Sequence, residues 1–194
     1  MKTMLKAMRK KNSGISEDVL PIFERIIQKY EALGAPSLGP DCDKEFKEAM
    51  EKHLTKEQRW RLYETNGGCM GTGHDKDRKI FALEYAHLDL DERMALFAET
   101  FDRHRPVLND DNTISVTFTC SHRYGKVKRD KIKNSPPPPI VEPYFECCAG
   151  GRLYELQKAL GIKLKIKSVD ISSLEENFDN PVVYTFEIVD NTLA

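Results

Sequence analysis

The spacing of apolar residues changes once along this 194-residue chain, at the turn sequence Asn-Asp-Asp-Asn of residues 109–112. Before this turn, apolar residues recur every three to four positions, which is the period of an amphipathic helix. After it, Ile114 and Val116 alternate with polar residues, which is typical of a strand with one buried face. The change predicts a helical region over 1–108 and an α+β region over 109–194, both belonging to one integrated domain.

Start and stop signals divide the first region into several helices. Thr-Lys-Glu-Gln at 55–58 and Asp-Leu-Asp-Glu at 89–92 have the pattern of capping boxes, each of which begins a helix. Residues 1–11 fit either a short amphipathic helix or a frayed terminus, and the frayed terminus is the prediction. The other helices are expected over 16–34, around 46–54 and over 75–87.

In the second region, two-residue alternation predicts an antiparallel sheet. Each expected strand has a polar face, so helices should cover only the other side of the sheet. The fold class predicted is therefore α+β, with a helical N-terminal half and, in the C-terminal half, an antiparallel sheet with helices packed on one face. The strands are expected near 113–121, 162–168 and 182–189, with a helix near 149–160.

Composition excludes some classes of function. A formal net charge of −1 gives no general attraction to nucleic acid or to anionic membranes. The basic stretch 123–133 has only Tyr124 as an aromatic, so it is a poor platform for stacking bases, and a solvated loop or exposed hairpin is predicted there. The start of the chain has no apolar core of a signal peptide, and no apolar run is long enough for a membrane span, so a cytoplasmic protein is predicted.

Two adjacent cysteines, Cys147 and Cys148, are followed closely by Gly150 and Gly151. Five cysteines with two adjacent form a poor disulfide framework, so metal binding or thiol chemistry is the expected use. The predicted helix 149–160 would place both thiols at a helix N-terminus, where the positive end of the dipole lowers a thiol pKa. The glycines would let a ligand, an ion or another backbone approach, which makes them candidate cofactor-binding residues.

A zinc site is predicted because further thiols and imidazoles lie on two other segments. Cys120 and His122 form a Cys-x-His pair on one face of the expected strand. Such a pair can hold a single ion from two sides, since zinc bonds to sulfur and nitrogen are about 2.3 and 2.1 Å long. Adjacent cysteines seldom bind the same ion, so the expected set is Cys69, Cys120, Cys147 and one histidine. The candidate metal ligands are Cys69, His74, Cys120, His122, Cys147 and Cys148.

Three short stretches of the C-terminal half carry a resemblance to a known family: the sequence 143–151, Leu160-Gly161, and the sequence 184–188 (Tyr-Thr-Phe-Glu-Ile). On these residues the C-terminal half resembles the 4-vinyl-reductase type of hydrocarbon-binding domain and its relatives, including aminothiazoline carboxylate hydrolase-like proteins and cysteine-rich bacterial proteins. Tyr184 stands where the family has a cysteine. The resemblance implies an α+β ligand-binding domain with a pocket between sheet and helices, in which cysteines bind zinc or line the cavity.

These observations leave three functions open. The first is a small-molecule-binding or sensor-type protein with a Cys/His zinc site. The second is a cysteine-dependent hydrolase, with Cys147 or Cys148 as nucleophile, His122 or His74 as base and helix N–H groups around Gly150 as oxyanion hole. The third is a structural or partner-binding protein with buried thiols. A small-molecule ligand is the expected partner, nucleic acid is not expected, and homodimer formation stays open.

Overall fold

The computed structural model describes residues 1–34, 40–66, 75–101, 105–119, 141–176 and 180–190. The helices of the N-terminal region are α1 (Lys2–Met8), α2 (Leu20–Ala32), α3 (Pro40–His53), α4 (Lys56–Asn66), α5 (Asp75–Glu84) and α6 (Leu90–Phe101). The C-terminal region contains β1 (Val107–Asn109), β2 (Thr113–Phe118), α8 (Glu142–Leu160), β3 (Lys163–Asp170) and β4 (Val182–Asp190). Short 3-10 helices occupy Lys11–Ser13 and Ser172–Glu175. The fold class is α+β, as predicted.

The four strands form one antiparallel sheet in the order β1-β2-β4-β3. The expected alternation is present, because Leu164 and Ile166 of β3 are buried while Lys163, Lys165 and Lys167 between and beside them are exposed. The three predicted strands correspond to β2, β3 and β4 within the described residues. The short strand β1 was not predicted, since three residues are too few to show a period of two.

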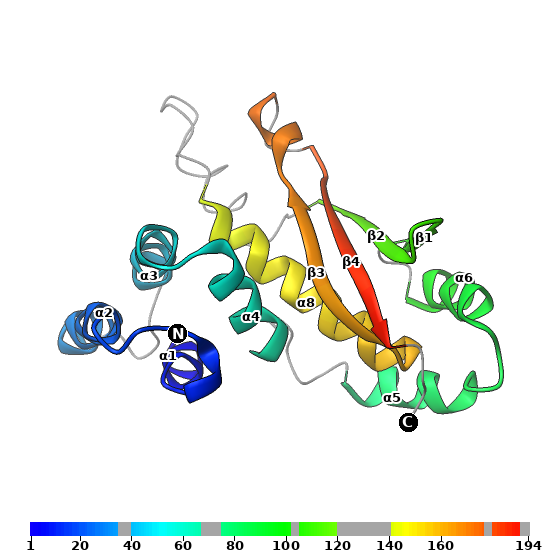
Figure 1. The fold of residues 1–194 in the computed structure, drawn as a ribbon, viewed down its shortest axis with the longest axis horizontal. Helices are drawn as coiled ribbons and strands as arrows, with labels where there is room; N and C mark the ends of the chain where they lie inside the picture. The colour runs from blue at the N-terminus through cyan, green and yellow to red at the C-terminus, as the bar shows by residue number, and fades with distance from the viewer. Residues whose placement is uncertain (35–39, 67–74, 102–104, 120–140, 177–179, 191–194) are drawn as a thin grey trace.

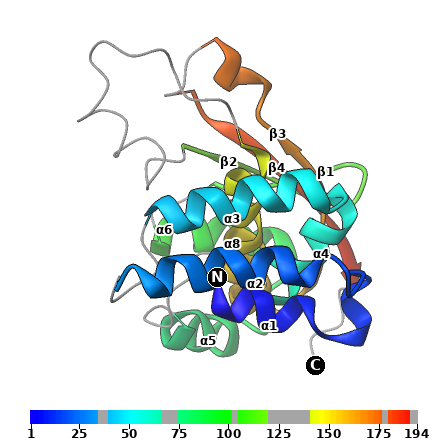
Figure 2. The same ribbon diagram turned by 90° about the vertical axis from the view of Figure 1, so that its left-hand side faces the viewer.

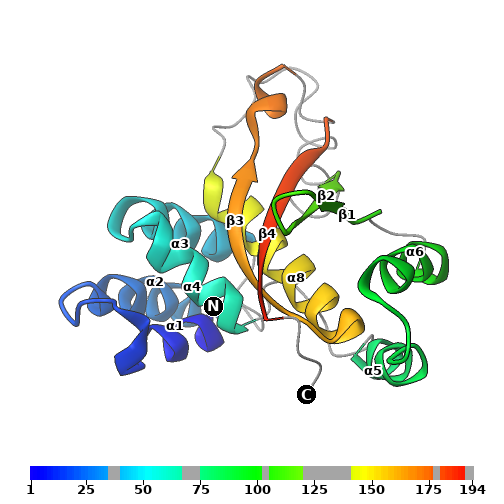
Figure 3. The ribbon, with the colours of Figure 1, turned by 45° about the vertical axis from the view of Figure 1, so that its right-hand side comes forward.

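Helix α8 is the centre of the fold. Figures 1 and 3 show it crossing one face of the sheet, with α1 to α4 on one side and α5 and α6 on the other. It contacts α3, α4, α5, α6 and β3. Its residues Ala149, Leu153 and Leu160 are fully buried. Helices of the N-terminal region and the sheet of the C-terminal region therefore both pack on this one helix.

Two apolar cores lie on different sides of α8. The first is formed by α8, the inner face of the sheet, α5 and α6, and includes Phe97, Leu153 and Tyr184. The second is formed by α1 to α4 against α8, and includes Phe23 and Cys147. Figure 2, the view onto the second core's outer side, shows α3, α2 and α1 stacked one above another. Among the described residues, no helix combines the length and apolar character that a membrane span needs.

Local signals place most helix ends. Both capping boxes are present: the Gln58 N–H donates to Thr55 Oγ1 (3.3 Å) and the Thr55 N–H to Gln58 Oε1 (2.9 Å), with the equivalent bonds between Asp89 and Glu92. Helix α8 ends at Gly161, which has a φ of 66°, in the left-handed region that favours glycine.

Two predictions of helix extent are wrong. Residues 2–8 form α1 instead of fraying, because Leu5, Ala7 and Met8 are buried in the second core. Helix α8 begins at Glu142 and not near 149. Pro143 falls in its first turn, where backbone N–H groups have no partner within the helix, so the N–H that proline lacks is not missed and the helix is not interrupted.

Side chains cover the free edge of the sheet at β3. The Leu164 N–H donates to Gln157 Oε1 (2.7 Å), and the Ile166 N–H donates to Glu64 Oε1 (2.8 Å). An open edge strand would offer such donors to a strand of another chain. Glu64 on α4 and Gln157 on α8 occupy two of these positions.

We expect Glu64→Ala to lower the free energy of unfolding by about 1–3 kcal/mol, because it leaves the part-buried Ile166 N–H without an acceptor. Glu64→Gln keeps an amide oxygen at the same place and should cost less. Urea unfolding measures both, and size-exclusion chromatography reports whether Glu64→Ala also self-associates. Equal stability of the two variants would show that the edge contact is not needed.

Candidate functional site

Cys147 and Cys148 lie inside α8, as its sixth and seventh residues. The expectation that they occupy a helix N-terminus is therefore wrong. The favourable effect of the positive helix end falls off beyond the first turn, and the amides of the second turn already donate within the helix. A proline in the first turn is compatible with a helix that begins at Glu142, so both thiols fall in the second turn.

The two cysteines face different sides of α8. Cys147 is 7% exposed and belongs to the core formed with α1 to α4. Cys148 is only partly buried and packs at the border of the sheet-side core. Successive helix residues point about 100° apart, so two adjacent thiols meet different neighbours. The expectation that only one of them would bind a given ion stays a prediction.

Cys147 lies beside a tyrosine and a lysine that are also buried. The Tyr63 hydroxyl is 3.5 Å from Met50 Sδ, and burial raises the pKa of Tyr63, which keeps the phenol neutral. The Lys47 ammonium lies 5.6 Å from the centre of the Tyr63 ring and 5.0 Å from that of Tyr144. These contacts stabilise the packing of α3 and α4 on α8.

At Gly150 the backbone of α4 approaches α8 closely. A Cβ atom at this position would lie 2.8 Å from both Cβ and the carbonyl oxygen of Tyr63. The sequence left open whether a ligand, an ion or another backbone approaches Gly150. Within the described residues, the backbone of α4 does so. Gly151 is also buried inside α8, and its role in cofactor binding stays a prediction.

Three segments are anchored on a short stretch of α8. The end of α4 meets Gly150 through Tyr63. The start of α5 is held by Asp75, which accepts a 2.6 Å hydrogen bond from the Tyr154 hydroxyl and thereby has a lowered pKa. The end of β2 is held by Phe118, whose ring centre is 5.3 Å from the Arg152 guanidinium. All three contacts fall within residues 150–154.

Four of the predicted metal ligands lie outside the described residues. These are Cys69, His74, Cys120 and His122. The described part of the chain contains no group of three Cys, His, Asp or Glu side chains that could hold an ion. The fifth cysteine, Cys42, is buried in the α1 to α4 core, and burial raises its thiol pKa, so it is an inert core residue.

Sequence reasoning missed a buried ion pair between α4 and α8. Arg59 donates to both carboxylate oxygens of Glu146, at 2.7 and 2.9 Å, and Trp60 Nε1 donates to the same carboxylate at 3.1 Å. The Arg59 and Glu146 side chains are 6% and 1% exposed. Glu142 also accepts from Arg59, at 2.8 Å. Burial raises the pKa of the Glu146 carboxyl, and the donors from Arg59 and Trp60 oppose that rise.

A second buried carboxylate holds the other end of α8. Glu155 is 3% exposed and pairs with Arg78 of α5 and, at 2.6 Å, with Arg152. The Arg78 guanidinium also lies 3.5 Å from the centre of the Phe101 ring. The sequence does carry one signal of these buried ion pairs, which is the mixture of glutamates with apolar residues around α8. A charge on a helix that is buried on most sides requires a partner. Sequence does not name the partner.

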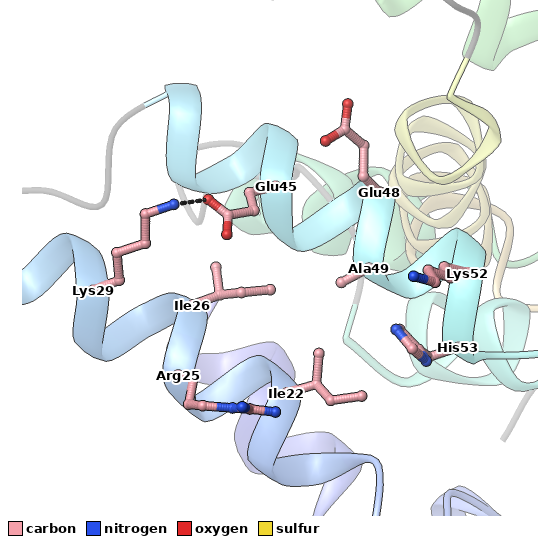
Figure 4. A pocket seen from close by; sticks show the side chains of 9 residues that line it. All are labelled: Ile22, Arg25, Ile26, Lys29, Glu45, Glu48, Ala49, Lys52 and His53. Carbon is pink, nitrogen blue, oxygen red and sulfur yellow. Dashed lines mark hydrogen bonds and ion pairs between the residues drawn. The ribbon is translucent and has the colours of Figure 1, made fainter.

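A groove of about 550 Å³ lies between α2 and α3 (Figure 4). Its walls run from Ile22 to Lys29 on α2 and from Glu45 to His53 on α3. The groove was not predicted, because it depends on how two helices with separate stripes pack. It lies on the α1 to α4 side of the molecule (Figure 2).

In comparisons with known proteins, no family model, curated protein or solved structure matches the chain. The resemblance to hydrocarbon-binding domains of the 4-vinyl-reductase type stays a prediction. The implied space between sheet and helices is occupied, at least in part, by buried side chains such as Val116, Leu153 and Phe186.

Replacing Arg59 by Leu should lower the free energy of unfolding by about 3–5 kcal/mol, because the buried Glu146 carboxylate loses its partner. The double variant Arg59→Leu/Glu146→Leu should recover much of this loss. Arg9 forms a bond of the same length, 2.7 Å, to Glu24 on the surface, so Arg9→Leu is the matched control and should cost about 0–1 kcal/mol.

Urea unfolding followed by Trp60 fluorescence measures all three variants. The stabilising role of the buried pair is contradicted if Arg59→Leu costs no more than Arg9→Leu, or if the double variant is less stable than the single one.

Proposed function

We propose that this chain is a small-molecule-binding or sensor-type protein that holds one zinc ion beside α8. The observation that carries the proposal is the convergence of three anchors on residues 150–154. Two of the anchored residues are close in sequence to candidate ligands. Asp75 directly follows His74, and Phe118 precedes Cys120 by two positions. Asn66, the last residue of α4, precedes Cys69 by three positions.

Of the two cysteines on α8, we assign the ligand role to Cys148. Residues four apart on a helix share a face, so Cys148 lies on the same face as Arg152, the residue that meets the end of β2. Cys147 points into the other core, beside Tyr63. The proposed ligands are therefore Cys148, Cys69, Cys120 and one of His74 and His122, in place of the set containing Cys147.

Zinc is the metal that this donor set favours. Thiolates and imidazoles select zinc over calcium and magnesium, which bind oxygen. Four protein ligands would make a closed, structural site. Such an ion would connect the segment after α4 and the end of β2 to the middle of α8, and so stabilise the frame around a ligand.

The cysteine-dependent hydrolase loses its main physical support. A nucleophilic thiolate needs a lowered pKa, and an oxyanion hole needs unpaired N–H groups. Cys147, Cys148 and Gly150 lie inside α8, where the helix uses the amides. The structural alternative, a protein with buried thiols only, is consistent with Cys42 and Cys147 and is separated from the proposal by metal analysis.

Tag-free protein should carry about one zinc ion per chain, because four ligands complete one tetrahedral site. Chelation should remove the ion and lower the melting temperature strongly, since structural zinc in small peptides contributes roughly 10–16 kcal/mol. Calcium and magnesium should not restore stability. Elemental analysis and thermal unfolding measure these outcomes.

The cysteine variants make the assignment specific. Cys148→Ser should lose zinc, whereas Cys147→Ser and the control Cys42→Ser should retain it. If Cys147→Ser loses zinc while Cys148→Ser retains it, the zinc site lies on the other face of α8. Absence of transition metal from the wild-type protein, with melting unchanged by chelator, would refute the zinc proposal and favour the structural alternative.

A further inference from the structure

The groove between α2 and α3 has an apolar floor and one closed end. Ile22, Ile26 and Ala49 line its floor, as Figure 4 shows. At one end Glu45 accepts from Lys29 (2.7 Å) and from the Tyr30 hydroxyl (2.9 Å), which joins the two helices. The lowered pKa of Glu45, caused first by the bond from Lys29, is consistent with a permanent charge pair there.

The other end of the groove is positively charged. Arg25 of α2 and Lys52 and His53 of α3 lie there (Figure 4). Within the described part of the chain, none of these three has an ion pair with an acidic side chain. The acidic side chain on the nearby wall, Glu48, is 3.7 Å from Lys44. The open end therefore offers the cations Arg25 and Lys52, beside the imidazole of His53, to a negatively charged group.

The dimensions of the groove favour a small molecule over a protein. Nine residues line it, whereas a stable protein interface uses roughly 20–30 residues on each side. Its volume of about 550 Å³ falls within the usual range of small-molecule sites. Its walls span eight residues of α2 and nine of α3, and at a rise of 1.5 Å per residue the groove is about 10–12 Å long. An extended aliphatic chain of about eight to ten carbons has this length, because its C–C bonds are about 1.5 Å long and zigzag along the chain.

We propose that this groove binds a medium-chain aliphatic carboxylate, with the chain along Ile22, Ile26 and Ala49 and the carboxylate beside Arg25, Lys52 and His53. The inference rests on the small-molecule-binding part of the proposed function and not on its zinc site. Zinc content and groove binding are measured separately, so the failure of one does not imply the failure of the other.

Affinity should depend on both chain length and charge. Each methylene group removed from water contributes up to about fourfold in affinity. Binding should therefore strengthen from hexanoate to octanoate to decanoate, and then level off in dodecanoate, because the Lys29–Glu45 contact closes the groove. A decyl chain with a trimethylammonium head should bind much more weakly than decanoate.

The experiment is a calorimetric titration of the full chain with these probes below their micelle-forming concentrations. Lys52→Glu and Arg25→Glu should each weaken decanoate binding by about tenfold or more, because each replaces an attractive cation with an anion that repels the carboxylate. Ala49→Phe should fill the floor and abolish binding. Lys163→Glu, an exposed lysine on β3, is the matched control and should leave affinity unchanged. Thermal unfolding checks that each variant folds.

Four results would overturn the proposal. These are absence of decanoate binding, equal binding of the decyl cation, unchanged affinity in Lys52→Glu, and unchanged affinity in folded Ala49→Phe. An acidic amphipathic peptide that binds more tightly than decanoate, and that Ala49→Phe also excludes, would make the groove a docking site for a partner instead.

Discussion

The contact on which the fold most depends is the buried pair between Arg59 of α4 and Glu146 of α8. The Glu146 carboxylate is almost wholly inaccessible and receives three hydrogen bonds from α4, two from Arg59 and one from Trp60. Replacing such a pair by apolar residues can be neutral, but removing one partner leaves a buried charge. The pair therefore specifies one alignment of α4 on α8. The close approach of Gly150 to Tyr63, one turn further along, requires that same alignment.

At the other end of α8, Glu155 fulfils the same function for α5 through Arg78. Both helical groups are thus fixed to one helix by a charge pair within an apolar surrounding. The contacts of Tyr63 and Asp75 with residues 150 and 154 lie between these two pairs along α8. The proposed zinc site uses that convergence on the face of Cys148, whereas the α2–α3 groove is formed at the outer side of the second core, with Ile26 belonging to both. Metal binding and ligand binding would then occupy opposite sides of the central helix.

Much of the fold follows from local sequence. The change of period at 109–112, the two capping boxes and Gly161 each have a local physical cause, and the structure contains all of them. The start of α8 does not follow, because the sequence predicted a helix only near 149–160 whereas α8 begins at Glu142. The tertiary packing of Gly150 against α4 outweighs the poor helix propensity of glycine.

The site was less predictable than the fold. Sequence identified the thiols of α8 but could not assign Cys147 and Cys148 to different faces, which required the true start of the helix.

The central claim, that thiol and imidazole ligands beside α8 hold zinc, is tested most directly by X-ray absorption at the zinc edge of the purified protein. The expected result is a shell of sulfur neighbours at about 2.3 Å together with nitrogen at about 2.0–2.1 Å. A shell of nitrogen and oxygen alone would contradict the claim.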